Sequence, residues 1–374
     1  MRFSKDSVRR IFSGLFLSAL TTGCQAPYIL KSAWSQADLL MSRKSLEKVM
    51  AQESIPEDVD GKTANTGVTA DEKKKLQLAI DAKTFGEEEL GLKKNSNYDS
   101  YVKLDRPYVS YVVSAAKKNH LEAHLWSFPI IGAVPYKGYF NQDDAKAEAE
   151  RLRNEGFDTY VRGVSAYSTL GWFDDPILSS MLRYTDYDLV NTIIHESVHA
   201  TLYINSQADF NERLATYIGN IGADLFFARR EGDQSPTLAQ ARSESDDDKL
   251  FSEFISAEID ALKLWYAEKS KNQALDPEFL KLRDAKFAEI AQRFESKIKP
   301  RLKSERYAKN LTQSLSPGNL NNARLLAWKL YVYDLSDFDR AYIALGRDPR
   351  KLIEFAKSLE KEKDAEAALK RFGR

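Results

Sequence analysis

The feature that most constrains this chain is the pentapeptide His195–His199, H-E-S-V-H, which follows a largely apolar run. Between Thr192 and Thr201 only Glu196 is charged and no residue is proline, so a buried helix can pass through the motif. Four residues of α-helix turn through about 400° and rise about 6 Å, so both imidazoles leave the same face. The pattern H-E-x-x-H is typical of zinc hydrolases, with two histidine ligands and the glutamate as general base.

An ordinary core helix with two hydrogen-bonded histidines and an incidental glutamate is the alternative interpretation. Burying these three polar side chains together without a metal is costly, so a metal site is favoured. Thr185 is expected to cap the start of the helix, with Asp188 three residues further on.

Two histidines do not complete a catalytic zinc site, which usually has three protein ligands and one open position. The segment Phe210–Gly219 has apolar residues at helical spacing, and Glu212 lies thirteen residues after His199. A tight turn at residues 205–207 would bring this helix beside the first, although a solvated glutamate is the alternative. The sequence therefore predicts Zn²⁺ held by His195, His199 and Glu212, with Glu196 as the base.

The other two histidines, His120 and His124, are also four residues apart. Leu121, Ala123 and Leu125 alternate with polar residues, which predicts a strand. Residues four apart on a strand are about 13 Å apart, too far to share one ion. We interpret this pair as surface histidines.

The whole chain has 374 residues, enough for a large core in one or two domains. Its 55 Lys and Arg residues balance its 55 Asp and Glu residues. No basic stripe points to a nucleic-acid partner.

The N-terminus is typical of an export signal. Basic residues precede a short apolar stretch, Ile11–Leu20, and small residues then lead to Cys24, the single cysteine. The pattern resembles a bacterial lipoprotein signal cleaved before Cys24, which would carry the lipid; a plain secretory signal is the alternative. The protein is then expected in the cell envelope, lipid-anchored and facing the periplasm or exterior. Gln25 favours the outer membrane if the cell is Gram-negative.

Periodicity and turn residues predict an α+β fold of the zincin-like type, with a small mixed β-sheet followed by a predominantly helical half. Early helices are expected at Ala33–Gln52, at Ala70–Leu90, and from Asn141 or Asp143 to Gly156. Strands are expected at Tyr108–Ala115, Leu121–Ile131 and Phe157–Val164. Later helices are expected from Asp186 onward, at Phe251–Lys271, Asp276–Leu311 and Leu320–Leu335, with a solvated acidic loop at Glu231–Lys249.

A candidate substrate strand, Ala166–Phe173, precedes the motif helix. A free sheet edge can hold an extended peptide by main-chain hydrogen bonds, and a packed loop is the alternative. The expected substrate-binding residues are Tyr167, Ser168, Thr169, Leu170 and Gly171.

Six blocks in order resemble the putative aminopeptidase family of bacterial lipoproteins, and the match covers nearly all of the mature chain. They are Trp126–Ile130, Pro135–Phe140, Ala166–Pro176, His195–His199, Phe210–Glu212 and Asn321–Leu325. The resemblance implies a zinc-dependent peptidase of the gluzincin type acting on a peptide. The expected domains are a signal peptide at 1–23, an anchored helix and linker at 24–69, and a zinc metallopeptidase domain at 70–374. Many gluzincins have an acidic residue four positions after the ligand glutamate, where this chain has Thr216. Another group must then orient a ligand histidine.

Related enzymes often stabilise the oxyanion with a tyrosine, and Tyr331 is our candidate. Three alternatives stay open: a non-catalytic envelope lipoprotein that binds a protein partner, a zinc hydrolase of another envelope amide such as cell-wall peptide, and an endopeptidase. We identify no acidic group that would bind a substrate's free amine.

Overall fold

The computed structural model describes residues 26–56, 67–128, 132–166, 169, 173–232, 234–269, 276–329 and 334–372. The chain divides into two compact units, residues 1–44 and residues 45–374. The first unit contains helix α2 (Ala26–Met41), and the short strand β1 (Lys44–Ser45) lies where the units meet in the sequence. Across the described ranges, no helix combines the length and apolar character needed to cross a bilayer.

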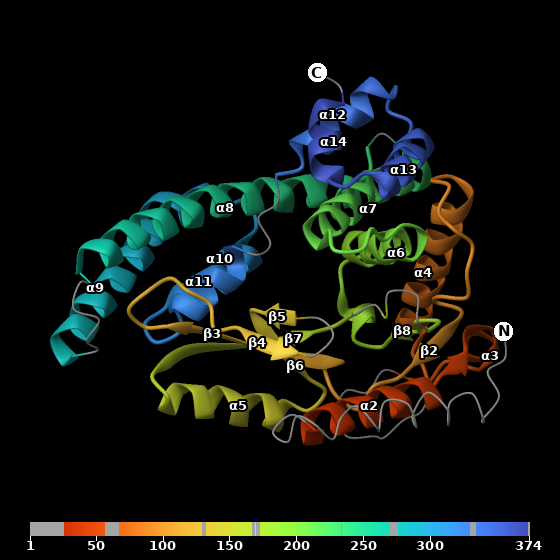
Figure 1. Cartoon of the computed structure of the whole chain (residues 1–374). Helices are drawn as coiled ribbons and strands as arrows, with labels where there is room; N and C mark the ends of the chain where they lie inside the picture. The colour runs from red at the N-terminus through yellow and green to blue at the C-terminus, as the bar shows by residue number, and fades with distance from the viewer. Residues whose placement is uncertain are drawn as a thin grey trace. The chain divides into compact units, whose positions relative to one another are not determined.

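The second unit has small sheets followed by a helical half, as Figure 1 shows. Its strands are β2 (Ser100–Val102), β3 (Ser110–Lys117), β4 (Trp126–Phe128), β5 (Gly132–Val134), β6 (Tyr136–Tyr139), β7 (Phe157–Val164) and β8 (Ile177–Leu178). Its helices up to the motif are α3 (Leu46–Ala51), α4 (Ala70–Glu88), α5 (Gln142–Asn154) and α6 (Asp186–Thr201). The later helices are α7 (Ala208–Glu231), α8 (Pro236–Lys269), α9 (Pro277–Arg293), α10 (Glu305–Leu315), α11 (Asn322–Lys329), α12 (Ser336–Ala344), α13 (Pro349–Ser358) and α14 (Ala365–Arg371). The predicted α+β class is confirmed.

Strands β6, β3 and β7 form a three-stranded antiparallel sheet in that order. β3 pairs along its whole length with β7, with Val113 opposite Val161, and it pairs with β6 on its other side. Six consecutive residues of β3, Tyr111–Ala116, are buried, as expected of a strand covered on both faces. Helices α5 and α11 both contact this sheet and lie on opposite sides of it in Figure 1.

The sequence signals around this sheet are mostly confirmed. Strand β7 has the predicted bounds, and the side chain of Asn141 caps α5 by accepting hydrogen bonds from two backbone N–H groups. Gly156 follows α5 with a φ of +89°, a conformation that favours glycine. The long strand expected at Leu121–Ile131 is wrong, because of its described residues only those of β4 form a strand. The alternating residues before β4 instead pack locally, with the His124 ring edge-on to Trp126 at 4.6 Å.

The helix expected at Ala33–Gln52 is also wrong, since α2 ends at Met41 and α3 starts anew at Leu46. The N–H of Leu46 donates to the Asp99 carbonyl rather than to a preceding turn. Helix α4, by contrast, has the predicted start, where Thr69 and Glu72 form a reciprocal capping box.

The expectation of a solvated loop at Glu231–Lys249 is wrong as well, because most of the segment belongs to α8. Helix α7 ends at Gly232, which has a φ of +80°, and α8 restarts at Pro236 with the Ser235 hydroxyl accepting from the Leu238 N–H. The acidic run lies within α8, and its middle residue, Asp247, is only 1 % exposed. The buried Asp247 carboxylate accepts hydrogen bonds from the backbone N–H groups of Lys303 and Ser304 at 2.8 Å, just before α10.

Replacing Asp247 by alanine should lower the free energy of unfolding by about 2–4 kcal/mol, because two buried backbone N–H groups lose a charged acceptor. Chemical denaturation monitored by circular dichroism measures the change. Asp246→Ala is the matched control, since Asp246 makes only an exposed ion pair with Lys303. Equal effects of the two substitutions would contradict the structural role of Asp247.

Candidate metal centre

Helix α6 presents His195 and His199 on one face. Its start is fixed by Thr185, whose side chain accepts a hydrogen bond from the Asp188 N–H as predicted. The two imidazole rings have centroids 4.9 Å apart and meet edge to face. One helix therefore supplies two nitrogen ligands without any long-range adjustment.

The turn between α6 and α7 is held by a single buried side chain, that of Asn211. Its Oδ1 accepts from the Ile204 N–H at 2.9 Å, and its Nδ2 donates to the Ile204 carbonyl at 2.8 Å. Within this turn Ser206 has a φ of 63°, so the chain reverses within a few residues. Because Asn211 immediately precedes Glu212, these bonds also fix the position of the Glu212 backbone.

Close approach of α6 and α7 depends on Gly219. A Cβ atom at Gly219 would lie 2.9 Å from the Asn191 Oδ1 and 3.4 Å from the His195 Cβ. A Cβ atom at Gly222, one turn later, would likewise be crowded by the Ile194 side chain of α6. A larger side chain at Gly219 would push α7 away from the helix that holds both histidines.

The structure brings His195, His199 and Glu212 together, with one possible ligand atom of each lying within 4.8 Å of the others. The Glu212 carboxylate oxygens lie 3.3 Å from the His199 Nε2 and 3.7 Å from the His195 Nε2. Ligand atoms arranged tetrahedrally at about 2.1 Å from Zn²⁺ are about 3.4 Å apart. Each of the two Glu212 oxygens lies close to that distance from one histidine Nε2. The three side chains are 20 %, 3 % and 44 % exposed, which leaves the Glu212 side open to solvent.

The two glutamates of the site differ in electrostatics. The imidazole of His195, and then that of His199, hold the pKa of Glu212 well below its usual range, so this carboxylate is ionised. Burial raises the pKa of Glu196, while the neighbouring imidazoles act in the opposite direction. A carboxylate with a raised pKa is suited to accept a proton, and one with a lowered pKa is suited to bind a cation.

Comparison with known proteins agrees with this geometry. The family model described as "Putative aminopeptidase" matches residues 27–370. The chain belongs to that family. No curated protein and no solved structure matches the chain. Membership of the Putative aminopeptidase family supports a peptidase, and the group of His195, His199 and Glu212 could hold a metal ion.

One polar atom of the candidate ligand residues has no hydrogen-bond partner among the described residues. The Nδ1 of His199 is buried and makes no hydrogen bond in the described part of the chain. Residue 216, four positions after Glu212, is a threonine, so no carboxylate at that position orients a histidine. The orientation of His199 comes instead from close packing, as the side chain is almost fully buried.

Two tyrosines close to Glu196 escaped the sequence analysis. Tyr98 is 3 % exposed with a φ of 63°; its burial, then the charges of Glu196 and Asp175, raise the pKa of its phenol well above the ordinary value. Burial also raises the pKa of Tyr184, with a smaller contribution from Glu196. Both phenols therefore stay protonated. No sequence pattern places residue 98 near residue 196, because only the fold connects them.

Of the five residues predicted to bind substrate, only Thr169 lies within the described part of the chain. Its N–H donates to the Asp175 Oδ2 at 2.9 Å, and its hydroxyl donates to the Phe173 carbonyl. Asp175 is buried and also contacts Asn97 and Tyr98 through its backbone. The segment is thereby connected to the chain beside Tyr98, and its substrate-binding role stays a prediction.

The remaining predicted residues divide into two groups. Outside the described residues lie Tyr167, Ser168, Leu170, Gly171, Tyr331 and the predicted lipidation site Cys24. His120 and His124 are described and half-buried, and burial lowers the pKa of His124. In the described ranges, the group of side chains able to hold a metal contains neither of them.

Gly219→Val should weaken zinc binding by about tenfold or more, and should destabilise the fold by about 1–3 kcal/mol, because the three added side-chain carbons push α7 away from α6. Zinc titration with a competing chelator measures the affinity. Gly138→Val is the matched control, since a Cβ at Gly138 in strand β6 meets nothing within 4 Å. Unchanged zinc affinity in the Gly219 variant would contradict the importance of the close helix contact.

Proposed function

We propose that this member of the Putative aminopeptidase family is a zinc-dependent peptidase. The observation that carries the proposal is the cluster of His195, His199 and Glu212, with donor spacings that suit Zn²⁺, next to a glutamate that is not part of the cluster. The family match supports hydrolysis of peptides. Zinc would supply Lewis acidity, polarising a peptide carbonyl and acidifying a water molecule.

The proposal assigns a role to each residue of the candidate site. His195, His199 and Glu212 would hold the ion, and the exposed side of Glu212 leaves room for substrate and water. Glu196 accepts a proton from the attacking water and later passes it to the leaving amine, a task for which its raised pKa is suited. The sequence suggests Tyr331 as the oxyanion donor, and Tyr98 and Tyr184, whose phenols are affected by the charge of Glu196, are further candidates.

Glu196→Gln should retain zinc and lose hydrolysis by about 10²–10⁴-fold, because the amide cannot accept the proton. The measurements are zinc content by mass spectrometry and digestion of a peptide library, read for cleavage at peptide ends or interiors. Glu212→Gln is the contrasting variant and should lose zinc as well as activity. Normal turnover by the Glu196 variant would refute its role as base, and release of N-terminal residues alone would establish an aminopeptidase.

We also propose that the protein is a lipid-anchored envelope enzyme that acts on peptides and not on nucleic acid. The support is the basic start, the apolar stretch Ile11–Leu20 and the single cysteine at the end of the small-residue segment. Gln25 supports the outer membrane in a Gram-negative cell.

Labelled palmitate should be incorporated into the wild-type chain and not into Cys24→Ala, because Cys24 is the only thiol available for a lipid. Gel fluorography after expression measures incorporation. An unlabelled wild-type chain released into the soluble fraction would contradict the anchor and indicate a plain secretory signal.

A further inference from the structure

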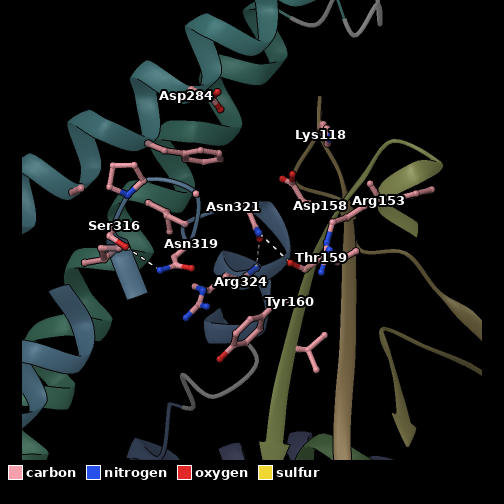
Figure 2. A pocket seen from close by; sticks show the side chains of 18 of the residues that line it. Lys118, Arg153, Asp158, Thr159, Tyr160, Asp284, Ser316, Asn319, Asn321 and Arg324 are labelled. Carbon is pink, nitrogen blue, oxygen red and sulfur yellow. Dashed lines mark hydrogen bonds between the residues drawn. The ribbon is translucent and has the colours of Figure 1, made fainter. Parts of the chain in front are cut away.

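A cavity lies beside β7, apart from the candidate metal-binding side chains. Its volume is about 850 Å³, and its walls come from β7, from α9 and from the segment that connects α10 to α11. Figure 2 shows this segment, with Ser316, Asn319 and Asn321, facing Tyr160 and Thr159 across the cavity. None of the three candidate zinc ligands lines it. Cavities of about 300–1,000 Å³ are the size that holds metabolite-sized ligands.

Arg324, from the first turn of α11, lines this cavity and lies between Asn319 and Tyr160 in Figure 2. Its backbone is fixed, because the Arg324 N–H donates to the Asn321 Oδ1 and the Asn321 Nδ2 donates to the Thr159 carbonyl. Its guanidinium carbon lies over the Tyr160 ring, 4.2 Å from the centroid. A guanidinium stacked by its face keeps its N–H edge free to bind a planar or tetrahedral oxyanion.

The guanidinium of Arg324 has no acidic partner among the described residues, and its Nε is buried without a hydrogen bond. The two buried arginines, Arg213 and Arg283, are both paired with an acidic side chain. Arg283 binds Asp158, and Arg213 binds Glu366. Burial lowers the pKa of Arg324, which reflects the cost of holding this charge away from water without a counter-ion.

The charges around Arg324 do not supply that counter-ion. Lys118, Lys146 and Arg153 also line the cavity. Arg153 pairs with Glu150, and no described group pairs with the two lysine ammonium groups. Of the two aspartates in the wall, Asp158 is already bound to Arg283 and to the Asn322 N–H, and Asp284 is 75 % exposed. The cavity therefore holds an excess of positive charge.

We propose that this cavity binds a small ligand that carries a carboxylate or phosphate group, and that Arg324 receives the oxyanion. A charge-assisted, two-pronged hydrogen bond would offset the cost of the unpaired guanidinium. The aromatic walls at Tyr108, Tyr160 and Phe287 would contact the apolar part of the ligand. The site does not depend on the peptidase proposal, since the two share no residue.

A purely structural role for Arg324 predicts a different behaviour. A cation–π contact with Tyr160 contributes about 0.5–2 kcal/mol, so its loss would lower the melting temperature without affecting any ligand. A binding role predicts that a neutral replacement leaves the ligand-free protein at least as stable, because a buried unpaired charge is removed. The two roles therefore differ in the sign of the change in melting temperature.

The experiment titrates the full-length protein, at low ionic strength, with inorganic phosphate, with succinate and with uncharged succinamide, by isothermal calorimetry. We expect saturable binding of phosphate or succinate and none of succinamide. The preferred probe then distinguishes a phosphorylated ligand from a carboxylic acid. Binding of neither anion by the wild-type protein would overturn the proposal.

Arg324→Gln should weaken that binding by at least about tenfold, because hydrogen bonds to a charged group are lost. Arg324→Lys keeps the charge and loses the planar fork, and should weaken it less. Arg229→Gln is the matched control, an exposed arginine outside the cavity that pairs with Glu89. Unchanged binding in Arg324→Gln, or an equal loss in the Arg229 variant, would overturn the assignment; a folded Arg324→Lys protein keeps the test decisive if the glutamine variant fails to fold.

Discussion

The close contact between α6 and α7 is the constraint on which the candidate metal centre depends. Two histidines one turn apart come from α6 alone, but the third ligand comes from a second helix whose axis must lie unusually near. Gly219 removes the side chain that would keep the helices apart, and Asn211 fixes the turn by bonding both backbone groups of Ile204. The placement of Glu212 is thus decided by packing and by a turn, and its charge state follows from the imidazoles it meets.

What the sequence predicted correctly was local. Strand β7, the start of α6 at Thr185 and the start of α5 at Asn141 all follow from periodicity and capping within a few residues. The error at Glu231–Lys249 involves partners distant in the chain. Asp247 has the sequence character of an exposed acid, but its hydrogen-bond donors come from residues 303 and 304. For the same reason the proximity of Tyr98 to Glu196 and the unpaired state of Arg324 could not be predicted, whereas the clustering of the two motif histidines with Glu212 was anticipated.

A buried polar network joins the sheet to the helices around the cavity beside β7. Asn322 is fully buried; its side chain accepts from the Tyr266 hydroxyl and donates to the Lys117 carbonyl, and its N–H donates to Asp158. Asp158 in turn binds Arg283 of α9. Because every partner is satisfied, the network costs little and fixes α8, α9 and α11 relative to β7. Arg324, two residues after Asn322, is held at a cavity wall that cannot easily rearrange.

Helix α8 is 34 residues long, which corresponds to about 51 Å of continuous helix. Towards one end it contacts α6 and α7, and towards the other it packs in the apolar cluster with α9, α10 and α11. A rod of this stiffness cannot bend freely between those contacts. The helix therefore holds the distal apolar cluster at a fixed spacing from the histidine-bearing helix.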